Sequence, residues 1–143
     1  MWARADLCVP LVQSRRLPLR DEADIIAARR AAKELAVALG FDLLAQVHVA
    51  TAVSELARNA LAYAGGGQLT LEPVRDGERH GLELVCRDEG PGIGDLPLAL
   101  VGSHSTGRGL GRGLSAARKL LDEFGVDTAP GRGTTVRARK WLT

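Results

Sequence analysis

The chain has 143 residues, of which 45% are hydrophobic and 25% are charged, and it carries a net charge of +2. These values are ordinary for one globular domain, and we expect residues 1–143 to form one, with residues 1–16 as an additional N-terminal segment. The weak charge requires neither nucleic acid nor a membrane as partner, and 3% aromatic residues argue against a platform that stacks unpaired bases. No apolar run approaches the ~20 residues of a membrane helix and no leader peptide is recognisable, so we expect a cytoplasmic protein.

The elements expected in the N-terminal half are an edge strand and two long helices. Apolar and polar residues alternate in short bursts near the N-terminus, and the prolines among them favour an edge strand. Asp21 or Asp24 can cap a helix that ends at Gly40. A second helix is expected from about Asp42 to Ala64, where three glycines in a row stop it.

The C-terminal half predicts a β-hairpin followed by glycine-rich loops, a helix and two strands. Residues 68–74 and 81–87 alternate in polarity on either side of an Asp-Gly turn, which indicates the hairpin. The later elements are expected as loops over 88–94 and 96–112, a helix over 114–124 that Gly125 stops, and strands over 126–128 and 134–141.

Two side chains of this half are expected to be buried. Cys86 lies in an apolar strand, far in sequence from Cys8 and without CxxC spacing, so we interpret it as a reduced, buried thiol. Trp141 is expected to anchor the core rather than to bind a ligand.

The second helix carries a pair of polar residues that could do chemistry. Glu55 and Asn59 are four residues apart, so they share one helix face in an otherwise apolar, alanine-rich stretch. An amide oxygen suits Mg²⁺, and a carboxylate one turn earlier could orient or deprotonate a hydroxyl nucleophile. Taken alone, the pair is more simply a surface glutamate and an asparagine in a helix.

Two loops have the composition of ligand-binding loops. The first, residues 88–94, starts with Asp88 at a strand end, where a carboxylate can accept a hydrogen bond from an exocyclic amine such as that of adenine. The second, residues 105–114, leads into a helix N-terminus, which suits phosphate. It lacks the Gly-Lys-Ser/Thr of a P-loop and the βαβ surroundings of a dinucleotide fingerprint. A fourth feature, residues 131–134, is a glycine turn that ends in a threonine hydroxyl.

The order and spacing of these four features resemble the GHKL (Bergerat-fold) ATPase superfamily. Residues 55–59 match its N box, residues 88–93 its first glycine box and residues 107–111 its second, with residues 131–134 following in order. Within the superfamily the chain is most similar to the anti-sigma and switch-kinase group, above all to the RsbT-type serine/threonine kinases of the stressosome pathway. This resemblance covers residues 24–142.

The resemblance implies a two-layer α+β sandwich, in which a mixed β-sheet packs on helices and a lid closes over ATP. Asn59 would hold Mg²⁺ that bridges the phosphates, Glu55 would activate the hydroxyl of the substrate serine or threonine, and Asp88 would bind the adenine amine. The other residues implied to bind the nucleotide are Gly90, Gly92, Ile93 and Thr134 around the base, and Ser105, Thr106, Gly107, Arg108, Gly109, Leu110 and Gly111 over the phosphates.

The implied reaction is ATP-dependent phosphorylation of a STAS-domain antagonist protein in a partner-switching pathway, with a PP2C-type phosphatase or a sigma factor as a further partner. The alternative is a nucleotide-gated anti-sigma factor or phosphatase-activating module without significant kinase activity. A detached histidine-kinase ATPase domain is disfavoured because no helix with a phosphoacceptor histidine precedes the domain, and DNA binding ranks last. The choice between monomer and homodimer stays open.

Overall fold

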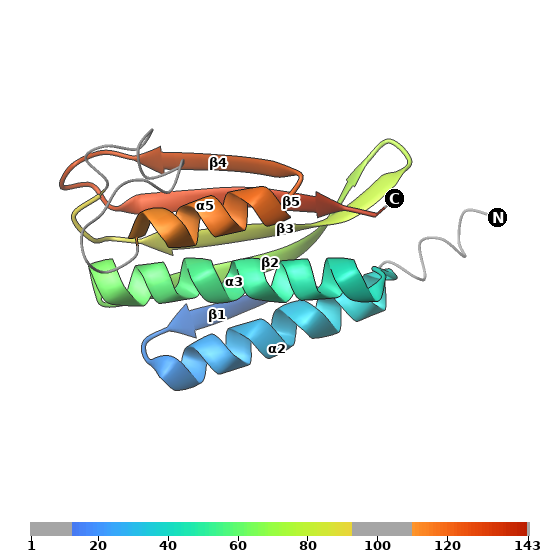
Figure 1. Cartoon of the computed structure of the whole chain (residues 1–143), viewed down its shortest axis with the longest axis horizontal. Coiled ribbons are helices and arrows are strands. Elements are labelled where there is room, and N and C mark those ends of the chain that lie inside the picture. The colour runs from blue at the N-terminus through green and yellow to red at the C-terminus, as the bar shows by residue number, and fades with distance from the viewer. Residues whose placement is uncertain (1–12, 93–109, 143) are drawn as a thin grey trace.

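The computed structural model describes residues 13–92 and 110–142, and for residues 110–113 it describes the backbone alone. The described chain forms two layers, a five-stranded sheet and three helices that cover one of its faces (Figure 1). No described helix is both long enough and apolar enough to cross a membrane.

The described strands form an antiparallel sheet. They are β1 (Arg15–Leu19), β2 (Gly67–Asp76), β3 (Arg79–Asp88), β4 (Glu123–Thr128) and β5 (Thr134–Trp141), in the spatial order β1-β2-β3-β5-β4. The two-layer α+β fold is confirmed, but the sheet is antiparallel in all four of these pairings rather than mixed as expected. Two helices, not one, connect β1 to β2, so the chain returns in the opposite direction, and hairpins join β2 to β3 and β4 to β5.

Helix α2 (Glu22–Leu39) begins and ends where the sequence places its signals. Asp21 is the N-cap, and its Oδ1 accepts a hydrogen bond from the backbone N–H of Asp24 at 3.0 Å. Gly40 ends the helix at a φ of 92°, a conformation that favours glycine. The buried face has the spacing of three and four residues that an α-helix requires, and it consists of Ile25, Ala28, Ala31, Ala32, Leu35 and Ala36.

Helix α3 (Leu43–Ala64) is the central helix of its layer. Asp42 caps it by accepting a hydrogen bond from the N–H of Ala45 at 2.8 Å, and Gly65 ends it at a φ of 75°. Its 22 residues span about 33 Å. It packs on α2 along one side and on α5 along the other, so its last turns are held at one end of the sheet (Figure 1).

Helix α5 (Leu110–Leu120) starts and ends four residues before the range 114–124 that the sequence predicts. The glycines before Leu114 favour a loop by local propensity. A glycine inside a helix costs only about 1 kcal/mol relative to alanine, however. Packing on α3 outweighs that cost, because Leu114 and Ala117 are buried in the core.

Strand β4 consequently starts at Glu123 and contains Gly125, where the sequence predicts the end of a helix. Phe124 and Val126 are half-buried and their neighbours are exposed, which is the period of two that a strand requires. Both residues lie opposite apolar residues of β5, so pairing with β5 rather than local propensity fixes this segment as a strand.

The main core lies between the sheet and the helices. Its largest fully buried side chains are Leu19, Val49, Val53, Leu56, Leu69, Leu71, Leu82, Leu84 and Leu114. Trp141 is buried as expected, but it alternates with the core residues of β5 and therefore lies on the helix-free face of the sheet. There it covers Gly81, and its Nε1 donates a hydrogen bond to Glu123 at 2.6 Å.

Candidate functional site

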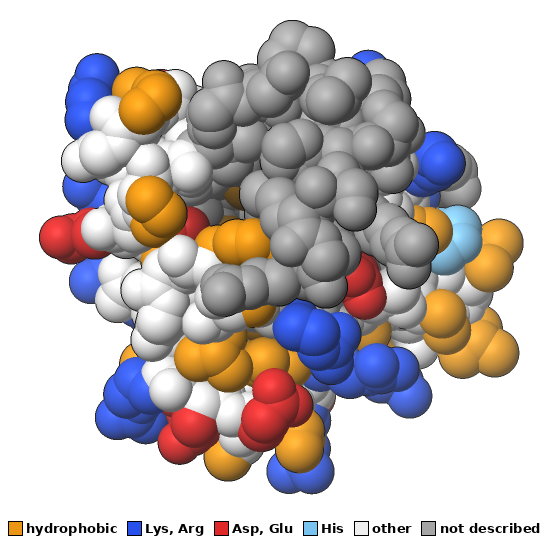
Figure 2. All heavy atoms as spheres, turned by 60° about the vertical axis from the view of Figure 1, so that its left-hand side comes forward, with side chains coloured by type: hydrophobic (Ala, Val, Ile, Leu, Met, Phe, Trp, Pro, Cys, Tyr) orange, Lys and Arg blue, Asp and Glu red, His pale blue; other side chains and the backbone are white. Residues whose placement is uncertain are grey.

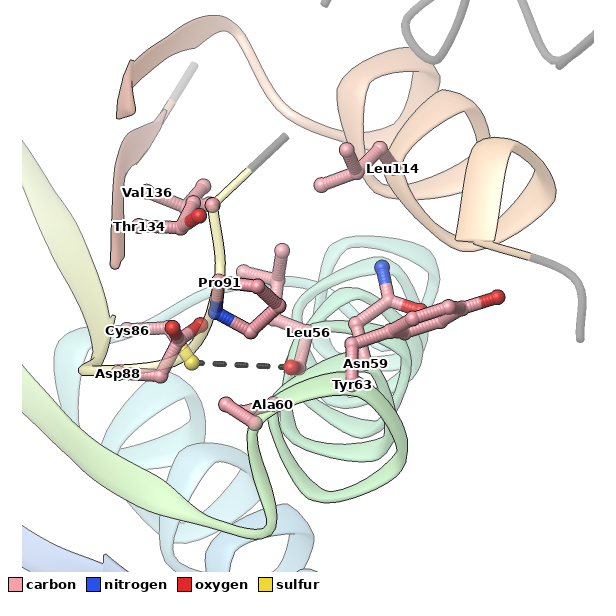
Figure 3. A pocket seen from close by; sticks show the side chains of 12 residues that line it. Leu56, Asn59, Ala60, Tyr63, Cys86, Asp88, Pro91, Leu114, Thr134 and Val136 are labelled. Atoms are coloured by element: carbon pink, nitrogen blue, oxygen red, sulfur yellow. Dashed lines mark hydrogen bonds between the residues drawn. The ribbon is translucent and has the colours of Figure 1, made fainter. Parts of the chain in front are cut away.

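A pocket lies between the last turns of α3 and the C-terminal end of β3, with β5 and α5 completing its walls (Figure 3). Four residues predicted for nucleotide binding line it together: Asn59, Asp88, Gly92 and Thr134. They come from α3, β3, the loop after β3 and β5, so the fold assembles the pocket from segments that are far apart in the sequence. Its remaining walls are mostly apolar, as is usual for small-molecule sites.

The Asn59 side chain contains a buried polar atom without a partner. Its Nδ2 is inaccessible to solvent and has no hydrogen-bond partner among the described residues. Such an atom lowers stability by roughly 1–3 kcal/mol, so native proteins rarely keep one without a reason. The amide lies at the pocket near Leu114 and Tyr63 (Figure 3), where a ligand could supply the missing hydrogen-bond partner.

The same amide fits the requirements of a magnesium ligand. Mg²⁺ binds hard oxygen atoms, needs few protein ligands and takes the rest from water and phosphate. The described residues contain no group of three His, Cys, Asp or Glu side chains placed to hold a metal ion. The amide oxygen of Asn59, at the wall of the pocket, is compatible with a metal held mainly by a bound phosphate.

Glu55 lies one helical turn before Asn59, outside the residues that line the pocket. Its side chain is 31% exposed, and its Oε1 is 3.5 Å from Nη1 of Arg58. A partly exposed ion pair of this kind contributes little free energy, so the carboxylate can exchange Arg58 for another partner. Glu55 is therefore accessible to a group that approaches from solvent.

Asp88 and Thr134 lie directly opposite each other where β3 ends and β5 begins. Oδ1 of Asp88 accepts a hydrogen bond from the N–H of Gly90 at 2.9 Å, which fixes the carboxylate at the start of the loop. Thr134 is 9% exposed, and its hydroxyl oxygen is 2.9 Å from that of Thr128 on β4. Both side chains of the pair border the pocket (Figure 3), so this end offers a carboxylate and a hydroxyl to a ligand.

The loop after β3 passes close to two other parts of the backbone. A Cβ at Gly90 would lie 2.5 Å from the Cβ of Ala64, at the end of α3. Gly92 has a φ of 81°, and a Cβ there would collide with the carbonyl oxygen of Ala129 in the β4–β5 turn. These glycines allow the loop to pack between α3 and that turn.

We expect Gly92→Ala to destabilise the protein more than Gly131→Ala. The two glycines have nearly the same φ, 81° and 79°, so the cost of the left-handed conformation, about 1–2 kcal/mol, is common to both. A Cβ at Gly131 meets no atom of the described residues within 4 Å, whereas at Gly92 it meets Ala129. Urea unfolding should give an additional loss of about 1–3 kcal/mol for Gly92→Ala. Equal losses would show that the loop moves away from the turn without cost.

Cys86 lies in the wall of the pocket as a buried free thiol, which confirms the sequence-based interpretation. It is 5% exposed, and its Sγ donates a weak hydrogen bond to the carbonyl oxygen of Leu56 at 3.6 Å (Figure 3). Burial, and to a smaller extent the negative charge of Asp88, raises the pKa of Cys86 from 9.0 to about 12. The thiol is thus a structural part of the wall and is not a nucleophile at neutral pH.

This pKa shift predicts a loss of stability in alkali. The thiol stays neutral in the folded protein up to a pH of about 12 but ionises in the unfolded chain above 9.0, so unfolding becomes more favourable as pH rises between these values. We expect Cys86→Ala to be less stable than the parent at pH 8. Above pH 9 its free energy of unfolding should fall less steeply with pH than that of the parent, and the two slopes should differ by at most about 1.4 kcal/mol per pH unit. Urea unfolding at pH 8, 9 and 10 measures both slopes, and parallel slopes would contradict the prediction.

The other predicted site residues are only partly described. Gly90 packs on the end of α3 and does not line the pocket. Leu110 and Gly111 lie in the first turn of α5, of which the backbone alone is described. The predictions for Ile93, Ser105, Thr106, Gly107, Arg108 and Gly109 lie outside the described residues.

Several wall residues were missed by the sequence analysis, although a simple signal could have found them. Residues on the pocket side of α3 recur at spacings of three and four around Asn59, and the strand residues lie two positions from Asp88 and Thr134. These wall residues are Leu56, Ala60, Tyr63, Cys86 and Val136. The contribution of Leu114 depends on how α5 packs on α3, which periodicity does not reveal.

The surface beside the pocket shows mixed chemistry. On the face shown in Figure 2, described Lys and Arg side chains are interspersed with acidic and hydrophobic ones.

The most exposed large hydrophobic side chains of the described chain are Leu43 and Leu44, 69% and 65% exposed, in the first turn of α3. They lie at the end of α3 opposite to the pocket.

A two-layer fold with an asparagine on its central helix, an aspartate at a strand end and glycine turns around one pocket defines a nucleotide-binding ATPase domain. The sequence model of the family described as histidine kinase-, DNA gyrase B- and HSP90-like ATPases matches residues 45–143, and the chain belongs to this family. ATP is therefore the ligand for which the fold is built.

The chain is also similar to individual proteins of known name. It is 44% identical over 121 residues to the serine/threonine-protein kinase RsbT of Bacillus subtilis (strain 168). The aligned region covers 85% of this chain and 91% of that protein. The chain is 33% identical over 100 residues to the anti-sigma F factor of Bacillus licheniformis and 30% identical to that of Thermoanaerobacter sp. (strain X514), each covering 66% of this chain and 68% of the relative.

Proposed function

We propose that this chain is a protein serine/threonine kinase that transfers the γ-phosphate of ATP to a STAS-domain antagonist in a partner-switching pathway. The observation that carries the proposal is the arrangement on α3, where Asn59 lines the pocket and the partly exposed Glu55 lies one turn away, outside the pocket. In this arrangement Asn59 is placed to bind the nucleotide in the pocket, and Glu55 is placed to meet a protein substrate outside it. The similarity to a relative named serine/threonine-protein kinase supports the same reading.

In this proposal Asn59 binds Mg²⁺ through its amide oxygen. When bound, the ion would neutralise the phosphates, which is the main electrostatic requirement of phosphoryl transfer. Rotation of the amide about its last bond exchanges its oxygen and nitrogen, so the buried amide can satisfy its polar atoms with a metal and a phosphate oxygen. The support for this assignment is the unpartnered Nδ2 in the pocket wall.

The base of the nucleotide would lie at the other end of the pocket. Asp88 would accept a hydrogen bond from the adenine amine, and Gly92, Ile93 and Thr134 would line the base. The segment from Ser105 to Gly111 would close over the phosphates. Support comes from the apolar walls around Asp88 and from the close packing of Gly92 on the β4–β5 turn, which fixes the loop that borders this end of the pocket.

Glu55 would act on the substrate hydroxyl. The serine or threonine oxygen of the partner attacks the γ-phosphorus, the bond from that phosphorus to the bridging oxygen of ADP breaks, and the hydroxyl proton passes to the Glu55 carboxylate. Rate enhancement then comes from positioning and charge neutralisation, without a covalent enzyme intermediate. The weak ion pair with Arg58 leaves the carboxylate able to turn toward the partner.

A second candidate is a binding module that holds a sigma factor or activates a PP2C-type phosphatase without significant kinase activity. The relatives named anti-sigma F factor favour it. The exposed Leu43 and Leu44 give the chain an apolar surface away from the pocket that a protein partner could cover.

The test is transfer of labelled γ-phosphate from ATP, with Mg²⁺, to the STAS-domain protein encoded nearest this gene. Mass spectrometry should identify a phosphorylated serine or threonine on that protein. ATP binding without transfer, together with nucleotide-dependent capture of a sigma factor or a phosphatase, would refute the kinase and favour the binding module.

A further inference from the structure

We propose that Thr128, which lies outside the pocket wall, fixes the direction of the Thr134 hydroxyl so that the base end of the pocket offers hydrogen-bond acceptors only. Such a site selects a purine that carries an exocyclic amino group and rejects one that carries an exocyclic carbonyl. The inference rests on the proposed nucleotide site and adds a positioning residue that determines its specificity.

The direction follows from the number of hydrogens. Oγ1 of Thr128 donates a hydrogen bond to the carbonyl oxygen of Gly133 at 3.0 Å. The same Oγ1 lies 2.9 Å from Oγ1 of Thr134. A hydroxyl group has one hydrogen, and a carbonyl oxygen can only accept, so the Thr128 hydrogen is used on Gly133. In the contact between the two hydroxyls, Thr134 must therefore be the donor.

As a consequence, the Thr134 hydroxyl can accept a hydrogen bond from a ligand in the pocket but cannot donate one. Its single hydrogen points toward Thr128, and its hydroxyl oxygen keeps only lone pairs for a ligand. Asp88, directly opposite Thr134 across the two strands, also presents oxygen acceptors at this end. An exocyclic amine finds acceptors here, whereas a carbonyl at the same position faces lone pairs without a donor.

The backbone holds the three members of this chain of hydrogen bonds in place. Thr128 and Thr134 are direct partners in the β4–β5 ladder, and Gly133 lies between them in the turn. Gly133 has a φ of 80°, and a Cβ there would collide with the carbonyl oxygen of Asp88 and lie 2.9 Å from the Cα of Glu89. The Gly133 backbone is thus packed closely against the end of β3. Successive hydrogen bonds of this kind reinforce each other.

The test compares ATP with inosine triphosphate, whose base has a carbonyl in place of the amino group. Equilibrium binding of both nucleotides, with Mg²⁺, is measured for the full chain and for Thr128→Val, which has nearly the same shape but no hydroxyl. In this variant the Thr134 hydrogen can turn into the pocket, so the preference for ATP over inosine triphosphate should fall about fivefold, the effect of one hydrogen bond. Thr128→Ser retains the hydroxyl and should keep the parent preference.

Several outcomes would overturn the inference. A preference that is unchanged in Thr128→Val, or reduced equally in Thr128→Ser, would show that Thr128 does not set the hydroxyl direction. If Thr128→Val does not fold, Thr128→Ala is measured in its place with the same expected result. A parent chain that binds neither nucleotide would refute the proposed function itself, whereas a parent that prefers ATP through a mechanism insensitive to Thr128 would refute this inference alone.

Discussion

Replacing Glu55 by glutamine should lower the rate of phosphoryl transfer by about 10²- to 10⁴-fold, the usual contribution of a general base. The amide keeps the shape of the carboxylate but cannot take the proton of the attacking hydroxyl. Because Glu55 lies outside the pocket wall, the affinity for Mg²⁺-bound ATP should stay within about twofold of the parent value. Single-turnover transfer to the STAS-domain partner and equilibrium nucleotide binding measure the two effects separately.

The matched control is Arg58→Ala, which removes the ion-pair partner of Glu55 and leaves the carboxylate. The pair is partly exposed and 3.5 Å apart, so its loss should change transfer by less than about threefold. If Glu55→Gln were as active as this control, Glu55 would have no role in proton transfer. If it lost ATP affinity and transfer together, Glu55 would belong to the nucleotide site instead.

Replacing Asn59 by alanine should abolish the stabilisation of the protein by Mg²⁺-bound ATP while leaving the ligand-free protein as stable as the parent or more stable. The mutation removes a buried polar atom without a partner and introduces the residue with the best helix propensity, for a gain of roughly 1 kcal/mol. It also removes the proposed metal ligand. Stability and ligand binding should therefore change in opposite directions.

Gln46→Ala provides a control on the same helix. The Gln46 Nε2 donates a hydrogen bond to the carbonyl oxygen of Phe41 at 2.9 Å, so this amide is already satisfied within the protein. Its removal should lower stability by about 1 kcal/mol and leave nucleotide binding unchanged. Thermal unfolding of both variants, with and without Mg²⁺ and ATP, makes the comparison. An Asn59→Ala protein that is still stabilised by the nucleotide would contradict the assignment.

The parts of the fold that the sequence predicted well are those with local signals. Asp21 and Gly40 bound α2, and Asp42 and Gly65 bound α3, because capping uses residues adjacent to the helix end. The β2–β3 hairpin was predicted from alternation around an Asp-Gly turn.

The parts that were predicted wrongly depend on contacts between distant segments. The boundary between α5 and β4 is set by packing on α3 and by pairing with β5, which local propensity does not contain. The pairing of β3 with β5, which completes the antiparallel sheet, joins strands that α5 and β4 separate in the sequence. Trp141 was recognised as buried, but its place on the helix-free face is a matter of strand register.

The candidate site likewise contains residues that sequence motifs predict and features that only the packed structure reveals. Asn59, Asp88, Gly92 and Thr134 could be predicted because they stand in motifs with fixed spacing, and they meet in one pocket. Thr128 has no motif, and its relation to Thr134 appears only once β4 and β5 are paired. The unpartnered Nδ2 of Asn59 is likewise a property of the packed structure.

Calorimetric titration of the parent chain with ATP, in the presence and absence of Mg²⁺, tests the central claim most directly. We expect one saturable site per chain, tighter with Mg²⁺ than without it, from which ADP displaces ATP. An absence of saturable heat, confirmed by an unchanged unfolding temperature at millimolar nucleotide, would contradict the assignment of the pocket between α3 and β3 as a site for Mg²⁺-bound ATP.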